Sequence, residues 1–354
     1  MRYLGLDVHS KATVWCLFGD SGRVVERGHV PTTAPELTTL VNRLSADDEL
    51  VAAQEVGTLS YFVHDVMTAA DVKLLSFNAQ QLRMIASSRK KTDRRDAYWI
   101  AKALQTEMTP HPVYIPSGPV RRLRQQLSQR EGLIHDRQRW LLRAQSSVRA
   151  AGQPVPRNRS PKKLQATLLR QPDGLDQPLI EALERCHRMH DALTKELAEL
   201  EAAILREAGS IDVVRRLQTI PGVGPWVALT IYAWVGDVTR FPNARSLTAY
   251  AGLVPSVWQS GDSLRQGGIT KQGAPALRSM LVQAGHALLG RCRSAEAAAL
   301  QELPARVHAR RKNRKIAVVA AARHILKLAY YVLRDGTTYD PARLTRRPQL
   351  DAAE

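Results

Sequence analysis

Cysteine is scarce in this chain. Its 354 residues include only Cys16, Cys186 and Cys292, which lie far apart and without paired spacing. This usage argues against a disulfide framework and against the closely spaced cysteine pairs of a structural zinc site. We therefore expect a protein of a reducing compartment.

Acidic residues are few beside basic ones, and no long apolar run is free of charge. Lysine and arginine number 51 against 33 aspartates and glutamates, which gives a formal net charge of +18. Charged residues interrupt the first apolar run at Asp7 and Lys11, and the apolar stretch 316–333 at Arg323 and Lys327. We expect neither a secretory signal nor a membrane span, and we place the protein in a prokaryotic cytoplasm, associated with the nucleoid. Such a charge attracts polyanions, although it also fits ribosomal and membrane-surface proteins.

The first 110 residues predict an α/β domain. Strand patterns occupy 2–8, 12–18 and 23–30, and Gly19-Asp20-Ser21-Gly22 supplies the turn between the last two. Helical and strand patterns then alternate, at 34–44, 50–54, 61–69 and 72–75. Three antiparallel strands followed by parallel crossovers is the order of an RNase H-like, or RuvC-like, sheet.

The next two segments are mainly helical. Apolar residues near a seven-residue period in 120–150 and 179–208 predict a helical hairpin or coiled coil within 118–208, with a basic, proline-rich linker at 152–163. Residues 209–338 predict a helical domain that ends in a long helix at 315–334. Its segment 217–228 resembles a helix-hairpin-helix, in which a glycine turn presents backbone N–H groups to a phosphate. We expect the tail 339–354 to be disordered.

Four acidic residues have a spacing that fits one metal site. Asp7 and Glu55 each end an apolar strand pattern, and Asp93 and Asp96 lie three residues apart at the start of a basic helix, where they share a face. Carboxylates at strand ends can converge on one point, and hard Mg²⁺ ions prefer oxygen ligands. Each acid alone also fits an ordinary turn or a helix cap.

Several basic and glycine residues are candidates for contacts with a nucleic-acid backbone. They flank the predicted acids, line the arginine-rich helix, form the helix-hairpin-helix turn, or follow residue 260. They are Arg89, Lys90, Lys91, Arg94, Arg95, Arg121, Arg122, Arg124, Gly222, Gly224, Arg265, Lys271 and Arg278. Solvated charge runs and the charged surface of a coiled coil have the same composition.

Ser260 is a candidate nucleophile because it precedes a glycine in a turn-rich segment, where a hydroxyl is presented with little steric cover. The same composition is ordinary for a plain turn. Trp258 lies beside it and is a candidate for stacking on a base.

The chain resembles the DEDD transposases, insertion-sequence recombinases typified by IS-one-ten and related to the Piv pilin-gene invertase. The resemblance covers nearly the whole chain. It rests on Gly5-Leu6-Asp7-Val8-His9, Glu55 followed by Gly57, Lys91-Thr92-Asp93-Arg94-Arg95-Asp96-Ala97, Ile220-Pro221-Gly222-Val223-Gly224, Ala251-Gly252-Leu253-Val254-Pro255, Gln259-Ser260-Gly261, Gly268-Ile269-Thr270-Lys271-Gln272-Gly273 and Leu277-Arg278.

This resemblance implies a RuvC-like domain in which Asp7, Glu55, Asp93 and Asp96 hold Mg²⁺, a coiled-coil insertion, and a C-terminal domain in which Ser260 attacks a DNA phosphate. It also implies a covalent phosphoserine intermediate, target and donor DNA, a structured bridge RNA whose loops pair with both DNAs, and a homo-oligomer from dimer to tetramer. Two other readings stay open. One is a RuvC-like endonuclease that uses metal-activated water, and the other is a non-catalytic nucleic-acid-binding protein.

Overall fold

The computed structural model describes residues 1–85, 93–155, 160–168, 176–260 and 263–341. The chain forms two compact units, Met1–Pro116 and Ser117–Glu354. The last thirteen residues, 342–354, which make up most of the tail predicted to be disordered, lie outside the described residues.

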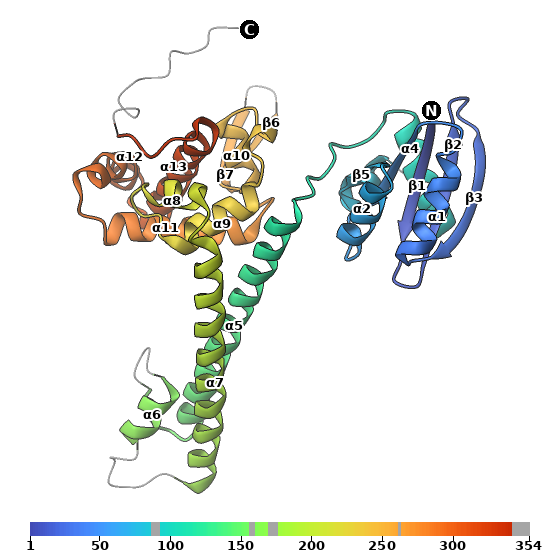
Figure 1. Cartoon of the computed structure of the whole chain (residues 1–354). Coiled ribbons are helices and arrows are strands. Elements are labelled where there is room, and N and C mark those ends of the chain that lie inside the picture. Colours follow the sequence, from blue (N-terminus) through green and yellow to red (C-terminus); the bar gives the residue numbers. More distant parts are fainter. Residues whose placement is uncertain (86–92, 156–159, 169–175, 261–262, 342–354) are drawn as a thin grey trace. The chain divides into compact units, whose positions relative to one another are not determined.

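The first unit is built on a five-stranded sheet with the strand order β3-β2-β1-β4-β5 (Figure 1). Its first three strands are antiparallel neighbours, whereas β4 pairs in parallel with both β1 and β5. The strands are β1 (Arg2–Val8), β2 (Ala12–Gly19), β3 (Val24–Pro31), β4 (Leu50–Glu55) and β5 (Lys73–Phe77). The predicted mixed α/β fold is confirmed, with each strand within two residues of its expected bounds.

Helices cover both faces of this sheet. Apolar residues of α1 (Ala34–Leu44) and α2 (Ser60–Ala69) pack with Leu4 and Leu6 of β1 in one buried cluster. The alternate residues of β1 and β4 face α4 (Asp93–Gln105). This helix packs with Phe77 of β5 and with Leu82 of the short helix α3 (Ala79–Ile85). Burying one leucine of this kind stabilises a fold by roughly 1.5–3 kcal/mol, so each sheet face contributes to holding its helices in place.

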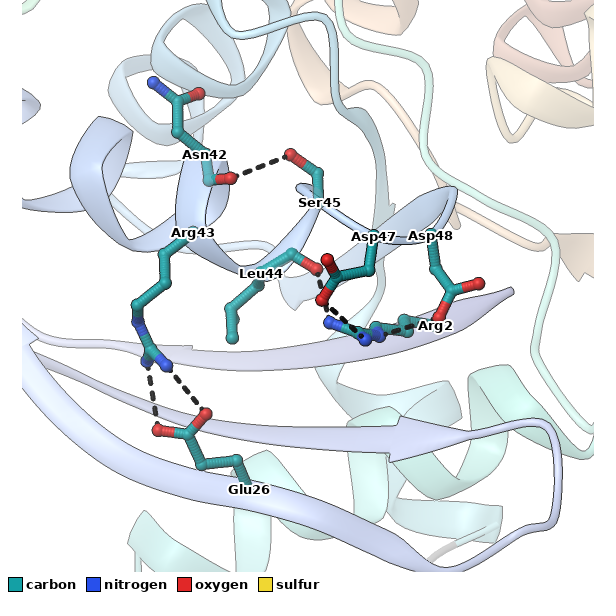
Figure 2. A network of polar contacts seen from close by, with 8 residues as sticks. All are labelled: Arg2, Glu26, Asn42, Arg43, Leu44, Ser45, Asp47 and Asp48. Carbon is teal, nitrogen blue, oxygen red and sulfur yellow. Dashed lines mark hydrogen bonds and ion pairs between the residues drawn. The ribbon is translucent and has the colours of Figure 1, made fainter.

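The start of β1 is fixed by a polar network (Figure 2). The Arg2 guanidinium donates to the carboxylates of Asp47 and Asp48 and to the carbonyl of Leu44, and its backbone N–H donates to the Glu49 carbonyl at 2.8 Å. These contacts join β1 to the turn that leads into β4. They therefore help to set the register between the two strands. A slip of one residue would move every side chain of a strand to the opposite face of the sheet.

The second unit contains two long helices that pack side by side (Figure 1). The start of α5 (Gly118–Ala150) packs with the end of α7 (Gln177–Ala208), and the end of α5 with the start of α7, so the pair is antiparallel. The short helix α6 (Pro161–Leu168) joins the second of these clusters through Leu164. Between Leu127 and Ala144 no α5 side chain is buried, and the middle of α7 buries only Leu197, so most of the apolar core of the pair lies at its two ends.

The rest of the second unit surrounds one apolar cluster. Its elements are α8 (Asp212–Gln218), α9 (Pro225–Val235), η1 (Val238–Arg240), α10 (Ala244–Tyr250), β6 (Pro255–Ser260), β7 (Ser263–Ile269), α11 (Pro275–Gly290), α12 (Ala295–Arg311) and α13 (Arg314–Asp335). The long final helix is confirmed to within one residue. The hairpin of β6 and β7 is not among the predicted elements, and neither are α6 and α12.

In the described part of the chain, α13 is the one helix long and apolar enough to cross a membrane, by length and composition. Its most apolar window has a mean hydropathy of 1.5, and 56% of that window is buried inside the unit. Ala321, Ala322, Ile325 and Leu326 belong to the central cluster. These features are equally those of the core helix of a soluble protein.

Candidate functional site

Asp7 and Glu55 lie at the same end of neighbouring strands. In the parallel register Gly5 is paired with Ala53 and Leu6 with Gln54, so Asp7 and Glu55 are the next residues on β1 and β4. Side chains alternate between the two faces of a sheet. The two carboxylates therefore leave the sheet on the face that also carries Gly5 and Ala53.

That face is covered by α4, which lies directly on β1. A Cβ atom built at Gly5 would overlap the carbonyl oxygen of Ala97 and the amide nitrogen of Ala101, and would come within 2.9 Å of the Ala101 Cβ. Ala97 and Ala101 are fully buried. Small residues on both elements thus allow the close approach.

The direction of α4 places its acidic start near Asp7. The last turn of the helix lies at the opposite end of the sheet, since the Lys102 Nζ is 5.5 Å from the centroid of the Phe18 ring and 3.5 Å from a Cβ built at Gly22. Gly22 belongs to the turn after β2, beside the start of β1. The first turn of α4, with Asp93 and Asp96, therefore points toward the end of β1 where Asp7 lies.

Asp7 has a histidine partner that was not among the predicted site residues. Its Oδ2 lies 3.1 Å from the His9 Nε2, and its side chain is 16% exposed against 52% for His9. The Thr32 hydroxyl donates to the His9 carbonyl at 2.7 Å and so fixes the backbone of this segment. The order Asp-Val-His, with two residues on one strand face, is the sequence signal for this pair.

The backbone around Glu55 is held on both sides. Gln54 is fully buried and its amide donates to the Ser60 carbonyl and the Ser76 hydroxyl, each at 3.1 Å. After Glu55, the Val56 N–H donates to the Phe77 carbonyl at 2.9 Å. These bonds keep the half-buried Glu55 side chain at the end of β4.

The donor chemistry at this sheet end is that of a hard divalent cation, because it consists of carboxylate oxygens. Among the described side chains, no three from histidine, cysteine, aspartate and glutamate lie close enough together to hold a metal ion. Asp93 is not part of this comparison. Its place at the start of α4 is described, but its side chain is not.

Most of the basic flank predicted beside the acids lies outside the described part of the chain. This applies to Arg89, Lys90 and Lys91, and to the side chain of Arg94. Arg95 is exposed on the first turn of α4.

Ser260 is the last residue of β6 and lies at the tip of a hairpin. It pairs with Ser263 at the start of β7, on either side of the connecting residues 261–262. The side chains of Ser260 and Arg265 are outside the description. Trp258 is 63% exposed on the same hairpin.

The base of the hairpin is held by a glycine-rich junction. Gly252 and Gly273 have φ angles of +67° and +94°, and a Cβ at Gly273 would overlap the Tyr250 carbonyl. The Arg278 guanidinium donates to the Ala251 carbonyl at 3.2 Å. Lys271 is exposed and has a φ of +55°, which a non-glycine residue rarely adopts. Arg278 is thus tied into the fold, whereas Lys271 faces solvent.

The helix-hairpin-helix segment has one glycine turned inward and one exposed. Gly222 has a φ of +88°, and a Cβ there would lie 3.0 Å from the Ala284 carbonyl oxygen of α11. Gly224 caps α9, is exposed, and has open space around its Cα. Contact with a phosphate is therefore sterically open at Gly224, whereas Gly222 makes the turn that packs on α11.

The predicted arginines of α5 differ in their surroundings. Arg122 is exposed and Arg121 is half-buried. Arg124 donates its Nε to the Ala233 carbonyl at 2.7 Å and an Nη to the Trp234 carbonyl at 3.2 Å, and so caps the end of α9. Sequence reasoning missed this second role, because it depends on a contact between residues more than a hundred positions apart.

Two family models match the chain. A transposase model of the DEDD, IS110 type matches residues 4–151, and the model of the IS116/IS110/IS902 transposase family matches residues 214–301. The first spans the sheet, the acids and α5, and the second spans the helix-hairpin-helix and Ser260.

Several curated proteins are similar to parts or all of the chain. A transposase for insertion sequence element IS1111A of Coxiella burnetii is 34% identical over 40% of this chain and 39% of its own length. The pilin gene-inverting protein of Moraxella lacunata is 33% identical over 35% and 38%. The alignments thus cover well under two thirds of these relatives.

One relative aligns almost end to end. An uncharacterised 43.6 kDa protein of insertion element IS110 from Streptomyces coelicolor is 26% identical over 96% of this chain and 95% of its own length. Together with the two family models, these similarities identify the chain as a member of the IS110 family of insertion-sequence transposases.

Proposed function

We propose that this protein is a DNA transposase that cleaves and rejoins the strands at the ends of an insertion sequence. Family membership supports the reaction class. The observation that carries the proposal is the shared face of β1 and β4, where Asp7 and Glu55 end adjacent strands and the acidic first turn of α4 approaches. Carboxylates at adjacent strand ends repel one another, and a cation bridging them to a phosphate would relieve that repulsion.

The four acids Asp7, Glu55, Asp93 and Asp96 would hold a divalent cation, which we take to be Mg²⁺. When bound, such an ion neutralises charge on a phosphate undergoing displacement. The protein's own contribution is positioning. The register of β1 with β4 puts Asp7 and Glu55 at adjacent strand ends, the first turn of α4 would bring Asp93 and Asp96 toward them, and His9 would orient the Asp7 carboxylate.

Ser260 is the proposed nucleophile. Its Oγ forms a bond to a DNA phosphorus, the bond from that phosphorus to a deoxyribose oxygen breaks, and the departing oxygen takes up the proton released by the serine. The phosphoserine linkage conserves the energy of the broken bond, so a second strand's hydroxyl can reverse the step without an energy-rich cofactor. A position at the tip of a hairpin suits this task, because the backbone there can approach a duplex.

The proposed partners are target and donor DNA, a structured bridge RNA, and further copies of the chain, from dimer to tetramer. Base pairing by the RNA would carry sequence specificity, while the protein binds backbone and shape. The formal net charge of +18 supports the binding of two nucleic acids.

A nicked suicide substrate tests the proposal, because it prevents religation and traps any covalent intermediate. We expect a protein–DNA adduct with the natural chain and none with Ser260→Ala, which should still bind DNA and RNA. Ser256→Ala is the matched control, since the Ser256 hydroxyl already donates to the Gly268 carbonyl at 2.9 Å. Free 5′-phosphate ends without an adduct would instead support an endonuclease that uses activated water. Unchanged function after neutralising all four acids would indicate a non-catalytic nucleic-acid-binding protein.

A further inference from the structure

Three cationic side chains on α10 and α13 have no acidic partner in the part of the chain that the structure describes. Arg323 and Lys327 are four residues apart on α13 and so share one face of the helix. Arg245 is on α10, which packs against α13 in the central apolar cluster (Figure 1). Within the described residues, no ion pair or hydrogen bond joins any of these three side chains to a carboxylate.

Burial makes this arrangement costly. The Nε of Arg323 is buried and has no hydrogen-bond partner among the described residues. Lys327 is half-buried, and its pKa is lowered first by burial and then by the nearby charges of Arg323 and Arg245. The adjacent His324 has a buried Nδ1 without a hydrogen-bond partner in the described structure, and burial and Lys327 lower its pKa. Every effect named here disfavours positive charge.

Other half-buried arginines among the described residues have acceptors. Arg130 pairs with Glu201, Arg216 pairs with Asp212, and Arg124 donates to the Ala233 and Trp234 carbonyls. Desolvated cations are normally paired, because the cost of removing a charge from water must be offset by a partner. The cluster of Arg245, Arg323 and Lys327 therefore has the character of half an ion pair whose anion comes from outside the chain.

A second group of cations lies around the start of α13. Six lysines and arginines, with no acidic residue among them, lie exposed between residues 306 and 315 at the corner of α12 and α13. They are Arg306, Arg310, Arg311, Lys312, Arg314 and Lys315. A helix rises about 1.5 Å per residue, so Lys315 and Lys327 are roughly 18 Å apart along the axis. That span suits an extended polyanion better than a single small ion.

We propose that Arg245, Arg323 and Lys327 form a binding site for the phosphodiester backbone of a nucleic acid. The proposal rests on the proposed function in one respect, that nucleic acid is the ligand. DNA and RNA offer the same phosphodiester chemistry, and the experiment below separates them.

The test is Lys327→Met, which removes the charge and keeps an unbranched side chain that fits a half-buried position. Binding is measured by fluorescence polarisation over a salt series, with a short random-sequence DNA duplex and with a single-stranded RNA as separate probes. Losing one phosphate contact should lower the slope of log affinity against log salt by about 0.9 for duplex DNA or about 0.7 for single-stranded RNA. The probe whose slope changes identifies the ligand. Lys195→Met, which removes an exposed lysine paired with Asp191, should change neither slope.

Chemical unfolding without nucleic acid gives a second readout. Because the charge of Lys327 has no acidic partner among the described residues, Lys327→Met should leave the free protein as stable as the natural chain or more so. A loss of stability would overturn the proposal, since the cation would then serve the fold. Arg245→Gln, at an exposed position on α10, should lower the same slope.

Binding of both probes with unchanged slopes by Lys327→Met and Arg245→Gln would also overturn the inference. The suicide-substrate assay keeps this failure separate from failure of the proposed function. A natural chain that traps DNA while these variants bind normally would refute the cluster alone. A natural chain that binds nucleic acid through the cluster but never cuts would refute the transposase reaction alone.

Discussion

Gly5 of β1 lies so close to Ala97 of α4 that a Cβ at Gly5 would overlap the Ala97 carbonyl oxygen. This contact sets the distance between α4 and the sheet. It therefore also sets how closely Asp96, the residue before Ala97, approaches the end of β1. One small residue on a strand therefore governs the position of acids that lie ninety residues later in the sequence.

Gly5→Ala should push α4 away from the sheet. The added methyl meets backbone atoms rather than a flexible side chain, so we expect a loss of about 1–3 kcal/mol in the free energy of unfolding, measured with urea. The rate of DNA strand cleavage should also fall, even where the variant remains folded, because Asp93 and Asp96 would move away from Asp7 and Glu55. Gly57→Ala is the control for stability, since a Cβ there has no neighbour within 4 Å. Equal stability of the two variants would mean that α4 is not seated on Gly5.

Asp96→Asn should abolish the response of the first unit to divalent cations. We expect Mg²⁺ to raise the melting temperature of the natural chain, because a ligand that binds only the folded state stabilises it. The variant should show little or no such shift and no cleavage, yet should fold. A shift of the same size in Asp96→Asn would argue against its place among the metal ligands.

Arg130→Lys should destabilise the second unit by about 1–3 kcal/mol. The Arg130 Nε donates to Glu201 at 2.7 Å, and its guanidinium carbon lies 3.9 Å from the centroid of the Trp226 ring, so one side chain joins α5, α7 and α9. Lysine can reproduce neither the fork nor the stacking. Arg139→Lys is the control, because its pair with Asp136 is exposed and should contribute little. Urea unfolding gives the free energy of unfolding of both variants, and equal values would contradict this role of Arg130.

Acidification should destabilise the second unit in part through His324. Burial, followed by the charge of Lys327, lowers the pKa of His324 in the folded chain. Below the ordinary histidine pKa of about 6.5, the unfolded chain therefore binds more protons than the folded one, and stability falls as the pH falls. His324→Phe should flatten the stability profile below that pH. His111→Phe, at an exposed position, should leave the slope unchanged.

The first unit was largely predictable because its signals are local. Alternating apolar residues and the Gly19–Gly22 turn define β2 and β3, and strand ends mark Asp7 and Glu55. What could not be predicted depends on contacts distant in sequence. The β6–β7 segment contains Gly267 and Gly268 and has little strand propensity, so only the pairing of the two strands forms it.

Other structural features that the sequence did not reveal have the same origin. Pro304 lies inside α12, where a sequence rule expects a break, yet it is buried and the helix continues. Arg124 and Arg278 have the composition of phosphate contacts, but carbonyl groups of their own unit accept their hydrogen bonds. Composition identifies a cation and does not reveal which acceptor the fold provides.

The uneven apolar core of the α5–α7 pair has a consequence for where this helical pair unfolds locally. The middle of the pair has only one buried side chain, Leu197 of α7, so its backbone hydrogen bonds are poorly shielded from water, and such segments open locally at low free energy. Amide hydrogens near Ile134 and His190 should therefore exchange with deuterium well before those near Leu127 or Leu183. The helical pair would then bend at its middle, while its two ends stay rigid.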